Sequence, residues 1–173
     1  MTRPRRMWLL GLVLAAVPFP APAPSFPDSA IVPSRAIGPY RLGMSAAEVQ
    51  RLAHTAPCSV SASYADGKVS RLETNCGGAY RTPETVQVGD GPNRMLAAYG
   101  TPERRSESSF GGVRGEWLHY RTGIAFRLVY GDESGGGLIQ AIAVFRGTAP
   151  YRVRPVPPMP LPAPAPLPSP GGD

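Results

Sequence analysis

The chain has 173 residues, a net charge of +6 and 22 prolines, and it has room for one folded domain. Seven prolines precede residue 34 and ten follow from residue 150 on, so neither end is suited to regular helices or strand ladders. The middle carries 13 basic and ten acidic residues, with the arginines spread singly. This distribution predicts a mixed solvated surface and argues against a nucleic-acid partner.

Residues 1–23 have the layout of a signal peptide. Three arginines precede an uninterrupted apolar run over residues 7–17. The run is about half of the ~20 residues that a spanning helix needs. We therefore expect a secreted or periplasmic protein without a stable membrane span once the leader is removed. The cleavage site stays open, because Pro24 follows the small-residue pattern Ala21-Pro-Ala23, and so does the export route.

Residues 24–36 form a predicted Pro-rich spacer, and we expect order to begin near Ile37. Ser45 is a good N-cap, and Glu48 completes a capping box. The pattern predicts a short helix over residues 46–55, held by packing of its apolar side.

A β-hairpin is predicted next, with strands over residues 59–64 and 68–75 and an Asp-Gly turn between them. Cys58 and Cys76 flank this hairpin, and antiparallel pairing brings such positions side by side. An even cysteine count in an oxidising compartment predicts a disulfide between them.

A second helix is predicted after Asp90, a candidate N-cap, with Pro92 in its first turn and Gly100 after its end. Residues 103–115 are expected to form a polar loop. Three strands follow in the prediction, over residues 116–121, 124–130 and 138–145, with a flexible loop over residues 132–137.

These elements form an internal tandem repeat of one short unit. Residues 67–73 correspond to residues 137–143, and Tyr64 is aligned with Tyr130. Further back, Gly43 and Gly89 precede their helices at the same spacing. We therefore predict an α+β domain over residues 37–147, a tandem pseudo-repeat in which two short helices cover one face of an antiparallel sheet.

Residues 148–173 form a predicted Pro-rich disordered tail. A passive spacer is the commonest meaning of such a tail. The alternative is a structural envelope protein whose tail spans or engages the cell wall.

The sequence contains no pattern that predicts a catalytic, metal or cofactor site. Neither histidine has metal-ligand spacing with other ligands, and the glycines at 135–137 lie between strands rather than before a helix. We predict a non-enzyme without cofactors. The less favoured alternative is a thiol enzyme that uses Cys58 with His54 or His119.

The helix-then-hairpin pattern, with Leu42-Gly43-Met44-Ser45 and later Tyr99-Gly100-Thr101-Pro102, resembles two kinds of exported bacterial domain. These are the β-lactamase inhibitor protein and the SmpA/OmlA outer-membrane assembly lipoproteins. The resemblance covers residues 37–145 and implies a non-catalytic domain that works by protein contact. The chain departs from the lipoproteins in having no cysteine near the end of the leader, and none of its residues can be matched to an inhibitor's contact set.

The predicted partner is another exported or envelope protein. The sheet face opposite the helices, carrying Arg127 with Arg71 and Arg121, is expected to be open to it. Aromatic and arginine side chains are common contact anchors, although core packing could equally claim Trp117 and Tyr130. The candidate contact residues are Tyr64, Trp117, Tyr120, Arg127 and Tyr130.

Overall fold

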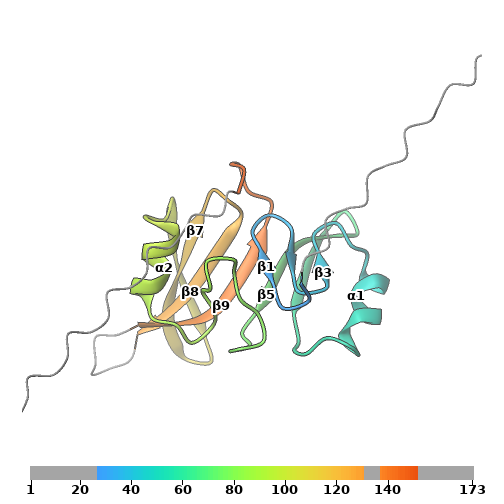
Figure 1. Ribbon diagram of the computed structural model, residues 1–173, viewed down its shortest axis with the longest axis horizontal. Coiled ribbons are helices and arrows are strands. Elements are labelled where there is room, and N and C mark those ends of the chain that lie inside the picture. Colours follow the sequence, from blue (N-terminus) through green and yellow to red (C-terminus); the bar gives the residue numbers. More distant parts are fainter. Residues whose placement is uncertain (1–26, 131–136, 152–173) are drawn as a thin grey trace, which may run out of the picture.

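The computed structural model describes residues 27–130 and 137–151, and it confirms the predicted α+β class (Figure 1). The described chain contains two helices, a six-stranded antiparallel sheet and a small three-stranded antiparallel sheet. The helices are α1 (Ala46–Ala53) and α2 (Pro92–Tyr99). The small sheet contains β1 (Ile31–Val32), β2 (Ala36–Ile37) and β3 (Tyr40–Arg41). The large sheet contains β4 (Ser61–Ala65), β5 (Lys68–Thr74), β6 (Arg104–Phe110), β7 (Val113–Tyr120), β8 (Ile124–Tyr130) and β9 (Gly137–Phe145).

The large sheet has the strand order β4-β5-β9-β8-β7-β6, and one of its faces forms the hydrophobic core. In Figure 1 the two helices lie toward opposite ends of this sheet, with β1 and β3 between them. The small sheet and the two helices therefore cover the core face together. Neither helix in the described part of the chain is long and apolar enough to cross a membrane.

Both helix starts follow from local chemistry. At α1 the predicted capping box is present: the Glu48 amide donates to the Ser45 hydroxyl, and the Ser45 amide donates to the Glu48 carboxylate at 2.7 Å. At α2 the predicted Asp90 cap is wrong, because Gly91 occupies the N-cap position. The Asp90 carboxylate instead accepts from the Gln87 amide at 2.9 Å and pairs with Arg94.

The predicted spacer over residues 24–36 is wrong in its second half. Ile31 is fully buried, and its amide donates to the Arg81 carbonyl at 2.7 Å. Strands of two residues are too short to show a hydrophobic period, so their burial depends on contacts with distant residues. The domain also extends past residue 147, because the Ala149 amide donates to the Arg121 carbonyl at 3.1 Å.

The predicted polar loop over residues 103–115 is also wrong. It contains all of β6 and the start of β7, joined by a turn in which Gly111 and Gly112 have positive φ. β6 is an edge strand, and polar side chains are common on edges because they discourage pairing with other chains. The predicted signal peptide, residues 132–136 of the predicted loop over 132–137 and the tail beyond residue 151 lie outside the described residues. Gly137, the last residue of that predicted loop, begins β9.

The tandem repeat is visible in matched backbone hydrogen bonds. The Gly43 amide donates to the Val69 carbonyl in β5, and the Gly89 amide donates to the Ile139 carbonyl in β9, both at 2.8 Å. The bonds in the opposite direction match as well. The Val69 amide donates to the Met44 carbonyl at 2.8 Å, and the Ile139 amide donates to the Asp90 carbonyl at 2.9 Å. Each copy therefore contains a glycine turn, an eight-residue helix and a hairpin whose second strand binds the turn. In the second copy, β6 and β7 lie between the helix and that hairpin.

The alignment of Tyr64 with Tyr130 is wrong by two residues. Tyr64 pairs with Val69, and the residue that pairs with Ile139 is Leu128. Both hairpins have an irregularity of register just before this residue, at Ser63/Tyr64 and at Arg127/Leu128. The repeat therefore includes the bulge, and the second hairpin continues two residues further toward its loop.

Candidate protein-binding face

On the face of the large sheet opposite the core, the two central strands carry small side chains, Ala125 in β8 and Ala143 in β9, which we call the alanine floor. His119, Ala125, Ala143 and Glu73 follow one another across β7, β8, β9 and β5 in the strand pairing. Ala125 and Ala143 are fully buried, although the helices and the small sheet pack on the other face. Larger side chains on this face must therefore cover the alanines.

Arg71 and Trp117 provide this cover. The Arg71 guanidinium lies 4.6 Å from the centroid of the Trp117 ring, in cation–π contact. Its Nη2 atom also lies 3.2 Å from the Glu73 carboxylate. Because β9 and β8 lie between β5 and β7, the two side chains must lean across the sheet to meet. The result is a half-buried aromatic and cationic surface over an alanine floor; we call it the open face.

His119 extends this surface in an aromatic row. Its ring centroid lies 6.4 Å from that of Trp117 and 6.1 Å from that of Phe145. Its Nε2 atom lies 3.0 Å from the Ser106 hydroxyl oxygen. Burial lowers the pKa of His119, and the nearby charges of Arg104 and Arg71 lower it further. The imidazole is therefore neutral at neutral pH.

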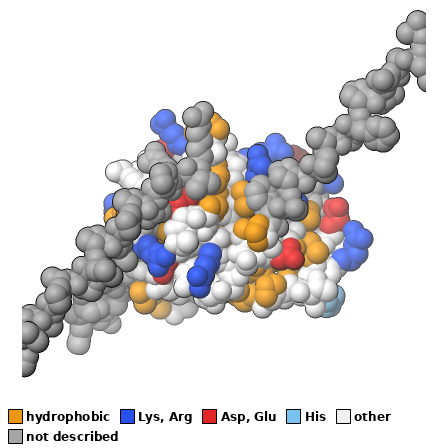
Figure 2. Space-filling view, in the orientation of Figure 1, with side chains coloured by type: hydrophobic (Ala, Val, Ile, Leu, Met, Phe, Trp, Pro, Cys, Tyr) orange, Lys and Arg blue, Asp and Glu red, His pale blue; other side chains and the backbone are white. Residues whose placement is uncertain are grey.

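One end of the open face is electropositive. A hollow of about 410 Å³ there is lined by His119, Phe145, Arg104 and Arg146, among others. Arg121 also lines it, but its Nε donates to the Glu103 carboxylate at 2.8 Å. Within the described residues, neither Arg104 nor Arg146 forms a salt bridge. This end is therefore suited to an acidic group of a partner. In the view of Figure 2, by contrast, basic and acidic side chains are interspersed.

The expected exposure of Tyr120 and Arg127 is wrong. Tyr120 is 5% exposed, packs against Phe126 and donates to the Gly100 carbonyl at 3.1 Å, so it belongs to the core. Arg127 does lie on the open face, directly opposite Trp117, but it is also only 5% exposed. Its guanidinium donates hydrogen bonds to the Ser108 hydroxyl in β6 and to the Gln140 side chain in β9. Arg127 therefore links neighbouring strands and does not project from the sheet.

Tyr64 and Tyr130 are exposed, but they project from the other face. Tyr64 pairs with buried Val69, and Tyr130 continues the alternation of Phe126 and Leu128 on the core side of β8. The Tyr130 hydroxyl donates to the Glu116 carboxylate. Of the five candidate contact residues, Trp117 is the one that remains partly exposed on the open face.

The sequence analysis does not place His119 or Phe145 on this face. It places Arg71 there, but not among the candidate contact residues. A signal for them was present in β9, where Ala141, Ala143 and Phe145 alternate with larger apolar residues. Small residues at every second position of a central strand indicate that something larger lies over them. Which side chains do so depends on the order of the strands, and the sequence does not supply it.

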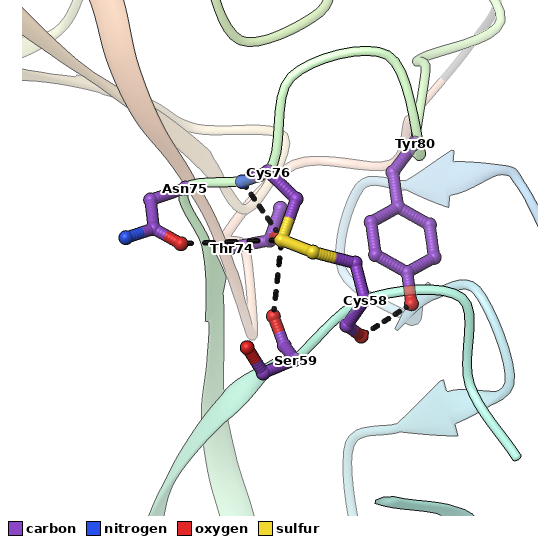
Figure 3. The surroundings of a disulfide bond; sticks show 6 residues. All are labelled: Cys58, Ser59, Thr74, Asn75, Cys76 and Tyr80. Atoms are coloured by element: carbon purple, nitrogen blue, oxygen red, sulfur yellow. Dashed lines mark hydrogen bonds between the residues drawn. A yellow bond between two sulfur atoms is a disulfide. The ribbon is translucent and has the colours of Figure 1, made fainter.

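The predicted disulfide is confirmed (Figure 3). Cys58 and Cys76 are bonded, with their Cα atoms 6.4 Å apart and a sequence separation of 18. The buried Tyr80 hydroxyl donates to the Cys58 carbonyl at 2.9 Å, which joins the disulfide to the core. The bond closes the base of the β4–β5 hairpin, the hairpin that carries Arg71.

The fold and the open face define a small α+β domain built on a duplicated helix-and-hairpin unit. No known protein family, curated protein or solved structure matches this chain. Among the described residues, no group of three or more His, Cys, Asp or Glu side chains could hold a metal ion.

Proposed function

We propose that this chain is an exported, non-catalytic protein-binding module whose open face contacts a partner protein. The observation that carries the proposal is the Arg71–Trp117 contact over the alanine floor. Tryptophan and arginine are enriched among the residues that dominate binding energy, and here they are half-buried before any partner arrives. Their prior ordering lowers the entropy that a partner must remove on binding.

Export is supported by the leader sequence and by the disulfide. Disulfides persist in oxidising compartments, and the bond between Cys58 and Cys76 is part of the folded domain. The resemblance to exported domains that act by protein contact points the same way. We therefore place the partner among other exported or envelope proteins.

Site-specific crosslinking in the native envelope tests the proposal. A photoreactive phenylalanine analogue replaces Trp117 on the open face or, as the control, Leu96, which is 38% exposed on α2. We expect a discrete crosslinked species from position 117 and none of the same mass from position 96. Equal products from both positions, or none from position 117, would overturn the assignment of the face.

A charge-matched pair of substitutions sharpens the test. Arg71→Glu removes the cation over Trp117, whereas Arg51→Glu makes the same change at an exposed position of α1. The first variant should reduce partner capture about thirtyfold or more, which corresponds to the ~2 kcal/mol of a binding hot spot. The second should behave like the parent. Equal capture by both variants would contradict a role for the open face.

A further inference from the structure

A second feature lies on the core side of the sheet, at the C-terminal end of α2. Glu84 is only 4% exposed, and within the described residues it forms no salt bridge. Its two carboxylate oxygens each accept one hydrogen bond, from the Tyr99 hydroxyl at 2.6 Å and from the Tyr151 hydroxyl at 2.5 Å. A buried carboxylate without a cationic partner is costly unless something compensates its charge.

Glu84 borders a cavity of about 510 Å³. Tyr99, Tyr120 and Tyr151 also line it, and the Tyr99 and Tyr120 ring centroids lie 5.6 Å apart. The hydroxyl oxygen of Thr122, another lining residue, is buried and has no hydrogen-bond partner. The cavity therefore combines aromatic walls, one buried carboxylate and one unused polar atom.

The charges around the cavity favour a cation. Arg121 and Glu103 also line it, but they pair with each other and leave Glu84 as the net charge. The last residues of α2 contribute Ala98 and Tyr99 to the wall, and the C-terminal end of a helix carries partial negative charge. Each oxygen of Glu84 has a second lone pair free to accept another hydrogen bond.

The tyrosines act here as neutral groups. Burial, followed by the nearby Glu84 carboxylate, raises the pKa of Tyr99 well above its ordinary value, and burial and a hydrogen bond to Glu84 do the same for Tyr151. Burial raises the pKa of Tyr120 to about 12. Neutral phenols are poor metal ligands, but their ring faces attract organic cations.

We propose that this cavity binds a protonated alkyl amine, with Glu84 as the charged partner and the three tyrosine rings as walls. An ammonium group donates hydrogen bonds, which both Glu84 and the Thr122 hydroxyl can accept. The cavity lies on the core side of the sheet, because Tyr120 and Trp117 project from opposite sides of β7. It adjoins the electropositive hollow at the end of the open face, since Glu103, Tyr120 and Arg121 line both. The amine proposal depends on Glu84 and Thr122, which do not line that hollow, and on neither Arg71 nor Trp117, so it can fail without the protein-binding function failing.

NMR titration of the full chain with n-butylammonium chloride tests the site, with 1-butanol as the neutral probe of equal shape. We expect saturable shifts with the amine and binding of butanol that is weaker by about tenfold or more, the worth of a hydrogen bond to a charged group. Tetramethylammonium, which cannot donate a hydrogen bond, should also bind more weakly. Equal affinity for butanol, or no saturable shift with the amine, would overturn the proposal.

The matched variants are Glu84→Gln and Glu107→Gln, which remove the same charge from the cavity and from an exposed position of β6. The first should weaken amine binding by about tenfold, and the second should leave it unchanged. If Glu84→Gln does not fold, Thr122→Val removes the unused hydroxyl at nearly constant volume and should weaken binding several-fold. Unchanged amine affinity in the folded Glu84→Gln protein, or in Thr122→Val where that variant replaces it, contradicts the assignment.

Discussion

Glu73 lies directly opposite Ala143 in the ladder that joins β5 to β9. When residues 67–73 are aligned with residues 137–143, these two residues are also each other's counterparts in the repeat. When two antiparallel strands are related by a two-fold axis, the residue at the axis pairs with its own counterpart in the other strand. The two hairpins therefore form a symmetric pair, and β6 and β7 extend one side of it.

The symmetry predicts equal energetic roles for Leu72 and Ile142, the fully buried counterparts next to the axis. Each substitution to Ala deletes buried methyl groups and leaves a cavity, so each should lower the free energy of unfolding by about 2–5 kcal/mol. Urea unfolding of the two variants measures this. Ser61→Ala, at an exposed position of β4, is the control and should stay within about 0.5 kcal/mol of the parent. A large loss in one variant and a negligible loss in the other would contradict equivalence.

The two glycine turns give a second prediction. Gly43 and Gly89 have φ of 88° and 97°, and no atom lies within 4 Å of a Cβ added at either position. Alanine would therefore meet only backbone strain, which costs about 1–2 kcal/mol. We expect similar losses of stability for Gly43→Ala and Gly89→Ala in thermal or urea unfolding.

Gly77→Ala is the matched control for the glycine turns. Gly77 does not have positive φ, and an added Cβ would meet the Val88 carbonyl at an ordinary 3.5 Å. This variant should be neutral or stabilising by up to about 1 kcal/mol, because alanine reduces the entropy of the unfolded chain. If it loses as much stability as the other two, backbone strain is not the cause.

The parts of the fold that could be predicted are those with local signals. Three features could be predicted because each depends on residues close together in the sequence. They are the Ser45–Glu48 capping box, the alternation over residues 124–130 and the repeated pattern of residues 67–73. The parts that were missed depend on distant contacts. β1 and β2 have two residues each, and β6 is polar because it lies at an edge.

The candidate face shows the same limit. Trp117 was predicted as a contact residue from its type, and the structure leaves it partly exposed on the open face. Tyr120 is three positions further along the same strand, and alternation places it on the opposite side, against Phe126. The error at Arg127 has another cause: only the strand order shows that Ser108 and Gln140 are close enough to bind its guanidinium.

The disulfide gives a third prediction. It closes an 18-residue loop, so replacing both Cys58 and Cys76 by Ser should cost about 3 kcal/mol through the entropy of the unfolded chain. Urea unfolding of the parent with and without reductant should show the same loss, and the Ser variant should not respond to reductant. Alkylation of the native protein should occur only after reduction. Rapid alkylation without reductant would contradict the bond and would revive the thiol-enzyme alternative.

His119 gives a prediction about pH. Its pKa in the folded protein lies below the ordinary value of 6.5, because of burial and then the charges of Arg104 and Arg71. The unfolded chain therefore binds a proton more readily than the folded one, and stability falls as pH drops from 6.5 through the folded pKa. Well above 6.5 both states are neutral at this position, and the histidine has no effect on the pH dependence.

Urea unfolding at about pH 7.5 and about pH 5.5 tests this, because ordinary carboxylates, with pKa values of about 4, stay almost fully ionised across that window. His119→Gln should lose less stability between the two pH values than the parent. His54→Gln removes an exposed histidine at the end of α1 and leaves the His119 contribution in place.

Arg71→Gln removes one of the charges near the imidazole, so the NMR titration of His119 should move toward higher pH. A His119 titration at or above the ordinary value in the parent would contradict the arrangement of Arg71, Trp117 and His119 on the open face.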